Sequence, residues 1–374
     1  MHVLRCFGRL AIEDGEGERV QLRSRKHLAL LLYLAAHRDR RHDRGRVARL
    51  FWDTEIDLAR HSLSQALYDL RQHVAGLDLD RTNREVGLGP AGLVYEGQEF
   101  EAAVQNDDLG RAVELYGGPF APDIETVGGS DFERWVERER TRYRSLAEKA
   151  LLRRVSECSD AGRWGKMCVA GSRLVDMNPL NEEAHRAVMR GLWLQGDREA
   201  ALGHFDEYED LLDRELPRGL DQETRNLVGR IRQAGRPGGR PSVHERPRPD
   251  MVGREEEFRT LKRALSEVKQ GQSGQSSFIV VRGEAGIGKT RLLEEFADVA
   301  ELEDVRLLRS RCYAAESDVP YGPIIDGLGE LARDVAESNA EGEAEFHQLG
   351  HLFPEAFGEP VRDEIYSMPD AMTR

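Results

Sequence analysis

Residues 57–74 read DLARHSLSQALYDLRQHV, and the apolar members of this stretch recur at helical spacing. The pattern predicts an amphipathic helix. We expect its buried face to consist of Leu58, Leu63, Ala66, Leu67, Leu70 and Val74. The outward face is polar and consists of Arg60, His61, Ser64, Gln65, Tyr68, Arg71 and Gln72. Such side chains pair with base edges and phosphates in a DNA major groove, so the helix predicts a recognition element.

The segments on either side of this helix complete the pattern of a winged helix-turn-helix domain. Residues 3–22 predict a hairpin of two short strands. Ser24 can cap the helical stretch that follows it, and His42-Asp43 precedes a second helical stretch. Residues 77–88 predict a closing hairpin, the wing, whose tip reads Arg81-Thr82-Asn83-Arg84. Strands, three helices and a terminal hairpin are typical of this DNA-binding fold.

Charge is distributed unevenly along the chain. The whole chain has a net charge of −14, yet the window 23–49 holds nine basic side chains and two acidic ones. Local charge is what a phosphate backbone meets, so one basic domain suffices for DNA binding. We expect DNA contacts from Arg44, Arg46, Arg60, His61, Ser64, Gln65, Tyr68, Arg71, Arg81, Asn83 and Arg84. The alternative is a helical domain with the same surface that contacts protein.

Three runs carry a resemblance to a known family. They are Ser24-Arg25-Lys26 leading into 30–34, then Leu50-Phe51-Trp52, then the stretch 62–71. In these runs the chain resembles the DNA-binding domain of the actinobacterial antibiotic regulatory proteins, the SARP family. The resemblance implies a winged helix like that of response regulators. It also implies a homodimer on direct-repeat promoter DNA that recruits RNA polymerase to an antibiotic or other secondary-metabolite gene cluster.

Residues 109–232 are dominated by helical periodicity with a weak repeat of 34 residues. Gly162 and Gly196 mark equivalent turns, which is the spacing of tetratricopeptide-like (TPR-like) units that stack on one another. The runs 116–120, 135–140 and 176–184 resemble the bacterial transcriptional activator domain that follows the winged helix in the SARP family. The alternative is an ordinary helical bundle. We find no catalytic constellation in this part of the chain.

The run GEAGIGKT at residues 283–290 fits the phosphate-loop pattern G-x-x-x-x-G-K-[ST]. It follows the apolar run 278–281, which predicts a buried parallel strand, and it precedes a helical pattern. Glycines let successive backbone N–H groups face a phosphate, and the helix start adds its dipole. We expect ATP to contact Gly283, Gly286, Gly288, Lys289 and Thr290, with Mg²⁺ on the Thr290 hydroxyl. The alternative is a glycine-rich turn that binds nothing.

The nucleotide module is expected to be incomplete. Hydrolysis needs an apolar strand that ends in an acid, and the nearest match, residues 324–326, instead predicts the first turn of an amphipathic helix. Residues 251–256 resemble the segment that opens the ATPase module of large SARP-type and other signal-transducing ATPases. The resemblance places Gly253 and Arg254 beside the adenine. We therefore expect weak ATP binding at most and no catalytic residues.

These patterns define a mainly α-helical chain with four regions. We expect a winged helix-turn-helix domain (α+β) at 1–98 and a TPR-like activator domain at 99–232. A linker rich in Pro, Gly and Arg follows at 233–250, and a partial α/β P-loop segment at 251–374. The composition gives no membrane-spanning segment and no secretory signal, so we expect a cytoplasmic transcriptional activator. The competing hypothesis is a signal-transducing P-loop ATPase whose N-terminal region senses protein partners.

Overall fold

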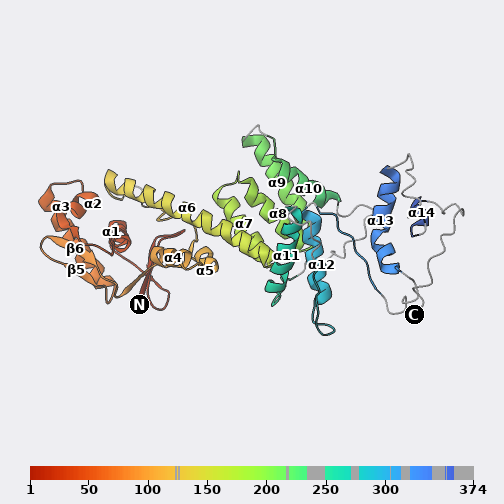
Figure 1. The fold of residues 1–374 in the computed structure, drawn as a ribbon. Coiled ribbons are helices and arrows are strands. Elements are labelled where there is room, and N and C mark those ends of the chain that lie inside the picture. The colour runs from red at the N-terminus through yellow and green to blue at the C-terminus, as the bar shows by residue number, and fades with distance from the viewer. Residues whose placement is uncertain are drawn as a thin grey trace, which may run out of the picture. The chain divides into compact units, whose positions relative to one another are not determined.

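The computed structural model describes residues 1–122, 124, 127–215, 219–233, 249–270, 278–303, 305–312, 321–338, 350 and 352–357. It divides into two compact units, Met1–Phe296 and Ala297–Arg374, and the boundary falls within helix α12 (Lys289–Leu302). Most described elements are helices, as the sequence predicts (Figure 1). No helix among the described residues is long and apolar enough to cross a membrane.

The N-terminal hairpin forms the centre of a four-stranded sheet with the order β3-β2-β1-β7. Its strands are β1 (His2–Arg5), β2 (Ala11–Glu13), β3 (Arg19–Val20) and β7 (Leu93–Tyr95). β1 runs antiparallel to β2, with Val3 opposite Glu13, and parallel to β7, with Val3 opposite Val94. The predicted first hairpin is therefore confirmed, and the chain returns to it after the wing.

Three helices and a second sheet make up the winged helix. The helices are α1 (Arg25–Ala36), α2 (Arg44–Phe51) and α3 (Ile56–His73). The second sheet has the order β4-β6-β5, with β4 (His42–Asp43), β5 (Leu79–Arg81) and β6 (Glu85–Leu88). The predicted Ser24 cap is present, because Ser24 Oγ accepts from His27 N at 3.4 Å. Asp43 caps α2 in the same way, since its Oδ1 accepts from Arg46 N at 2.8 Å.

The buried face of α3 corrects one expectation. Leu63, Ala66, Leu67, Leu70 and Val74 are buried as predicted, but Leu58 is 60% exposed. At about 100° per residue, Leu58 lies roughly 140° around the helix from Leu63. Its neighbour Ala59 lies about 40° from Leu63 and is fully buried in the place expected of Leu58. An apolar residue at the start of α3 thus stays in solvent.

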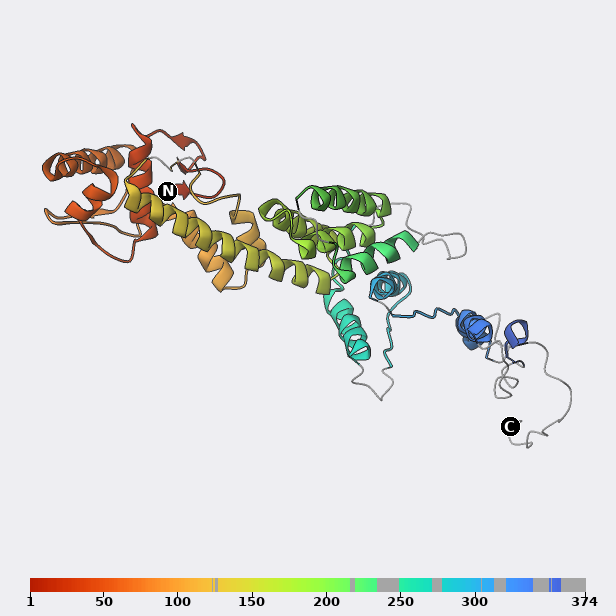
Figure 2. The ribbon, with the colours of Figure 1, turned by 90° about the horizontal axis from the view of Figure 1, so that it is seen from above.

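The chain then enters helices α4 (Glu96–Gln105), α5 (Leu109–Leu115) and α6 (Ser130–Asp160). One continuous hydrophobic core runs from Leu4 in β1 to Ala150 in α6. The boundary expected between residues 98 and 99 therefore falls inside a helix that shares this core. In Figures 1 and 2, α6 extends from the N-terminal helices to the helices that follow it.

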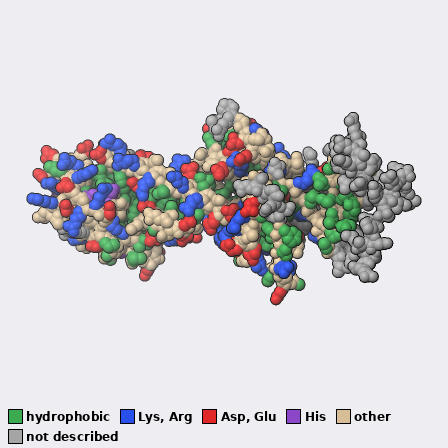
Figure 3. Space-filling model, in the orientation of Figure 1, with side chains coloured by type: hydrophobic (Ala, Val, Ile, Leu, Met, Phe, Trp, Pro, Cys, Tyr) green, Lys and Arg blue, Asp and Glu red, His purple; other side chains and the backbone are tan. Residues whose placement is uncertain are grey.

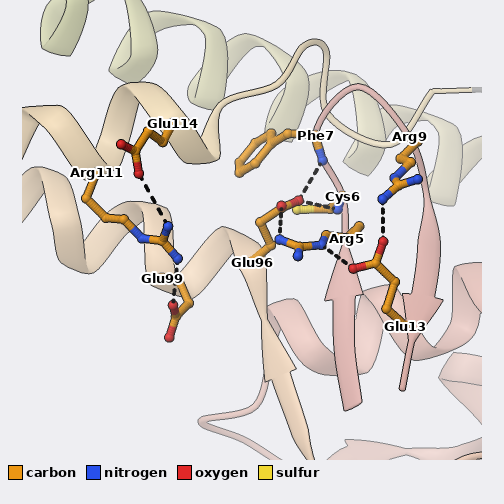
Figure 4. Close-up of polar contacts among 9 residues, drawn as sticks. All are labelled: Arg5, Cys6, Phe7, Arg9, Glu13, Glu96, Glu99, Arg111 and Glu114. Carbon is orange, nitrogen blue, oxygen red and sulfur yellow. Dashed lines mark hydrogen bonds and ion pairs between the residues drawn. The ribbon is translucent and has the colours of Figure 1, made fainter. Parts of the chain in front are cut away.

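A buried carboxylate joins β1 to α4 (Figure 4). Glu96 Oε2 accepts from the backbone N–H groups of Cys6 at 2.7 Å and Phe7 at 3.1 Å, and Glu96 Oε1 pairs with Arg5 Nη1 at 3.0 Å. Arg5 also donates to Glu13 at 2.8 Å, so β2 is tied to the same network. The Glu96 side chain satisfies two backbone donors at the point where β1 ends, which a buried chain requires.

The repeat region follows as α7 (Trp164–Met177), α8 (Glu182–Leu194), α9 (Arg198–Glu215) and α10 (Gln222–Gln233). Gly162 and Gly196 both take positive φ, +66° and +88°, in the turns before α7 and α9. Such φ values favour glycine because no Cβ is present. Neighbouring helices in this series pack together as antiparallel pairs (Figure 2), which agrees with TPR-like stacking.

The remaining elements are α11 (Glu255–Lys269), α12, α13 (Gly322–Ser338) and α14 (Pro354–Phe357). The helix predicted at residues 324–326 is confirmed as the first turn of α13. The strand predicted at 278–281 is wrong for this structure, because these residues pair with no strand among the described residues and Phe278 is 91% exposed. An apolar run forms a strand only where a neighbouring strand pairs with it.

The Glu96 network yields the first testable prediction. Replacing Glu96 with Ala leaves two buried N–H groups without an acceptor and removes one of the two carboxylates that Arg5 pairs with, so the free energy of unfolding should fall by about 3 kcal/mol. Glu99→Ala is the matched control on the same helix, because its carboxylate is half exposed and lies 3.9 Å from Arg111. That change should cost at most about 0.5 kcal/mol. Urea denaturation measures both, and equal losses would contradict a special role for Glu96.

Candidate functional site

The outward face of α3 is the first candidate site. Arg60, His61, Gln65, Tyr68 and Arg71 are exposed, and the Tyr68 side chain leaves 57% of its surface in solvent. The first turn of α3 also holds one acid, Asp57, which complements the dipole of the helix N-terminus. Figure 3 shows Lys and Arg side chains spread over the N-terminal elements in this view. The face predicted for base and phosphate contacts is therefore open to a ligand.

Arg44 and Ser64 lie together beside this face. Arg44 Nη2 donates to Ser64 Oγ at 2.8 Å, and the Ser64 hydroxyl donates to the Arg60 carbonyl at 2.9 Å. A Cβ built on Gly45 would come within 3.2 Å of Arg60 Nη2, so the Arg60 guanidinium lies over the start of α2. These contacts hold two guanidinium groups at the α2–α3 junction. Ser64 serves there to position Arg44.

His61 and Gln65 form a pair one helical turn apart. The Gln65 amide nitrogen lies 3.0 Å from His61 Nε2, and both side chains are exposed. Which atom donates depends on the histidine tautomer. A glutamine amide offers both a donor and an acceptor, the combination that adenine presents in the major groove. Tyr68 stands one turn further along the same face.

The wing contributes exposed side chains at its tip. Asn83 and Arg84 are exposed, and Thr82 Oγ1 accepts from the backbone N–H groups of Arg84 at 3.2 Å and Glu85 at 2.9 Å. The side chain of Arg81, also expected to bind DNA, lies outside the described residues. Arg71 donates to the Leu79 carbonyl, so it ties α3 to the wing strand β5. Arg46 is exposed on α2.

Asp69 is a residue that the sequence pattern did not single out. It lies on α3 with 3% of its side chain exposed and meets His27 at 2.7 Å and Arg23 at 3.1 Å. Burial acts to raise the pKa of Asp69, but hydrogen bonds from His27 and from the Arg23 backbone lower the pKa overall. The carboxylate therefore stays charged and fixes α3 against the start of α1. His27 and Arg23 lie more than 40 residues away from Asp69 in sequence, so local periodicity could not identify them.

The phosphate-binding loop is the second candidate site. Lys289 Nζ donates to the carbonyls of Gly283 at 2.9 Å and Glu284 at 2.7 Å, and Gly286 and Gly288 take φ of +79° and +100°. A Cβ at either of these two glycines would meet nothing within 4 Å, so the loop has open space on that side. Thr290 is exposed in the first turn of α12. These residues fit the phosphates of a nucleotide with its metal on Thr290.

Residues before α11 lie beside this loop. Arg254 Nη2 donates to the Ile287 carbonyl at 3.3 Å, and Arg291 Nη2 donates to the Pro249 carbonyl at 2.5 Å. Gly253 takes φ of +72° between these two contacts. The structure thus brings Arg254, predicted at the nucleotide, into contact with the loop. No group of three or more metal-ligating side chains is found in the described parts of the chain.

Helix α11 is anchored on the repeat region, which the sequence did not predict. Phe258 is fully buried, and its ring meets Trp164 edge to face at 5.7 Å between centroids. Arg163 pairs with Glu255 at 3.1 Å, and Lys262 pairs with Asp160 at 3.0 Å. In addition, Asp250 Oδ1 accepts from the Gly165 N–H at 2.9 Å. The first helix after the linker is therefore held by the turn between α6 and α7.

Comparisons with known proteins match two parts of the chain. The family described as the bacterial transcriptional activator domain matches residues 77–232, and the AAA ATPase domain family matches residues 250–364. Among solved structures, the chain is similar to Mycobacterium tuberculosis EmbR in complex with a low-affinity phosphopeptide. That likeness has 17% sequence identity and a TM-score of 0.43, and it covers 72% of this chain and 71% of that chain. A search of the curated proteins returned no match.

The loop geometry yields a prediction about nucleotide turnover. Described residues near Lys289 and Thr290 include no acid at the end of a strand to polarise an attacking water, so phosphate release from ATP should stay at background. The Lys289→Ala variant should give the same background rate in a phosphate-release assay. Steady release by the native chain that disappears in Lys289→Ala would contradict this. It would show that another acid completes the site.

Proposed function

We propose that this chain, a SARP-like regulator with an ATPase module on its C-terminal side, binds promoter DNA through α3 and the wing. The observation that carries the proposal is the exposed polar face of α3, where His61, Gln65 and Tyr68 stand together and Arg60 is exposed at its side. HTH proteins place such a helix in the major groove with its N-terminal part on the base edges. The match to an activator domain supports activation of transcription as the outcome.

The positions of the arginines distinguish contacts with the phosphate backbone from contacts with the bases in this proposal. Arg44 and Arg60 lie at the α2–α3 junction, and Arg84 lies on the wing, so they flank the α3 face on which Gln65 stands. Flanking arginines bind the phosphate backbone whatever the sequence, whereas base edges are read by side chains inside the groove. We assign Arg44, Arg46, Arg60, Arg84 and the wing residue Asn83 to the backbone, and His61, Gln65 and Tyr68 to the bases.

The resemblance to the SARP family supports the finer part of the proposal. In this proposal the chain acts in the cytoplasm as a homodimer on direct repeats and recruits RNA polymerase to an antibiotic or other secondary-metabolite gene cluster. ATP with Mg²⁺ is the ligand assigned to Gly283, Gly286, Gly288, Lys289 and Thr290, with Gly253 and Arg254 beside it. The AAA ATPase match supports nucleotide binding by this module.

The function is tested by selecting duplexes from a random DNA library with the full chain. Recovery of one sequence motif, bound in preference to scrambled DNA, is the expected result. If no motif emerges and the N-terminal region instead captures a protein partner, the signal-transducing ATPase hypothesis replaces the proposal. A second measurement places the selected motif upstream of a promoter, where the chain should raise transcription by RNA polymerase in vitro.

Base readout by Gln65 gives one prediction. Gln65→Ala should weaken binding to the selected motif by about 1–3 kcal/mol, because one bidentate base contact is lost. Binding to scrambled DNA should change little. Fluorescence anisotropy with both duplexes measures the difference, and Gln98→Ala, an exposed glutamine on α4, serves as the control. An equal loss on both duplexes would show that Gln65 does not read a base.

Backbone contact by the wing gives another prediction. Arg84→Ala should reduce the slope of log K against log salt by about 0.9, the value for one phosphate contact. The loss of affinity should be similar on the selected and scrambled duplexes, since phosphates carry no sequence. Arg153→Ala, an exposed arginine on α6 outside the DNA-binding face, is the control. An unchanged slope for Arg84→Ala would remove the wing from the interface.

A further inference from the structure

The start of α3 presents an apolar side chain to solvent. Leu58 is the third residue of the helix, and 60% of its surface is exposed. The core position beside it is filled by Ala59, which is fully buried. Leu58 therefore contributes little to the folded core, and its exposure leaves apolar area in water that a ligand would cover.

Leu58 shares its side of α3 with the residues assigned to base readout. At about 100° per residue, it lies roughly 20° around the helix from Gln65 and 60° from His61. Along the axis, Leu58 and Gln65 are about 10 Å apart at 1.5 Å per residue. A helix in the major groove that brings Gln65 to one base pair can bring Leu58 to a different base pair, at most about three steps away at 3.4 Å per base pair.

The face on which Leu58 lies decides what covers it. His61 and Gln65 lie on the same side of α3 as Leu58, and the exposed acids Glu55 and Asp57 are next to it in the sequence. Arg60 lies about 160° around the helix from Leu58, beside Arg44 at the junction with α2. An apolar side chain within the proposed base-reading face suits a groove that carries an apolar group. In DNA the C5-methyl group of thymine is that group, and apolar side chains contact it in the major groove.

We infer that Leu58 packs on the C5-methyl group of a thymine and so helps to specify the DNA sequence. This inference rests on the proposed function, because it requires α3 to enter the major groove. It assigns a specificity role to a side chain that the sequence pattern had placed in the core. Leu58 recognises the methyl group by shape and apolar burial, whereas Gln65 recognises the hydrogen-bonding groups of a base.

Deoxyuridine tests the inference, since it differs from thymine in lacking only that methyl group. Each thymine of the selected motif is replaced in turn, and the full chain is titrated against each duplex. One replacement should weaken binding about fourfold, the equivalent of ~0.8 kcal/mol for one buried methyl group. The Leu58→Ala variant should bind the native motif several-fold more weakly. It should also bind the thymine and deoxyuridine duplexes equally at that position.

Controls separate this contact from other effects. Val169→Ala removes a similarly exposed apolar side chain from α7 in the repeat and should keep the fourfold thymine preference. Leu58→Met keeps the apolar contact and should keep the preference as well. Thermal unfolding of Leu58→Ala should match the native chain, because Leu58 lies outside the core. A shifted unfolding midpoint with the thymine preference retained would make Leu58 a structural residue and overturn the inference.

Other outcomes would also overturn the Leu58 inference, and they show whether the proposed DNA binding fails with it. If the chain selects a motif but no thymine replacement matters, DNA binding stands and the Leu58 contact fails. If the thymine preference persists in Leu58→Ala, another residue reads the methyl group. If Leu58→Ala binds DNA normally but activates transcription less, its partner is RNA polymerase. If no motif is selected at all, the proposed function and this inference fail together.

Discussion

The buried Glu96 carboxylate is the interaction on which the architecture of the first unit depends. Strand β1 ends at Arg5, and the next two backbone N–H groups point into a region where no strand receives them. Glu96 accepts both, while its other oxygen holds Arg5. The chain can therefore leave the sheet and pair Cys6 and Gly8 with residues 117–121, where Ala121 N donates to the Cys6 carbonyl at 2.7 Å. One acceptor thus lets the winged helix and the activator domain share a core.

That shared core makes α6 a continuous element of both regions. Near its start, Phe132 packs on Phe51 of α2 at 4.6 Å between ring centroids, and Trp135 meets Tyr33 of α1 at 5.1 Å. Near its end, Asp160 pairs with Lys262 of α11. With 31 residues, the helix is about 46 Å long at 1.5 Å per residue. A displacement of its first turns would disturb aromatic packing on two helices of the winged-helix region.

The sequence predicted the elements more completely than their contacts. Helical spacing and caps located α1, α2 and α3, and glycine spacing located the repeat turns, because these signals are local. Leu58 was misplaced because an apolar residue was assigned to the core by type, although its angle around α3 separates it from Leu63. Glu96, Asp69 and the docking of Phe258 on Trp164 were missed because each joins residues far apart in sequence. The run 278–281 has strand composition, yet a strand also needs a neighbour to pair with.

The same contrast between local pattern and distant contact explains the nucleotide segment. The glycines of the loop could be predicted from the sequence because a positive φ is a local requirement of the backbone. The contacts that join the loop to the rest of the chain come from residues distant in sequence. Arg254 contacts the loop at Ile287, and Pro249 contacts Arg291 at the start of α12. Asp250, between these two residues, accepts from the Gly165 N–H, and Phe258 in α11 packs on Trp164. A phosphate that drew Lys289 away from the Gly283 and Glu284 carbonyls would have to replace two hydrogen bonds. Arg254 also donates to this loop, and the segment around Arg254 is fixed on the repeat region through Asp250 and Phe258. Rearranging the loop would therefore disturb that segment as well, so the loop depends on the helices that precede it.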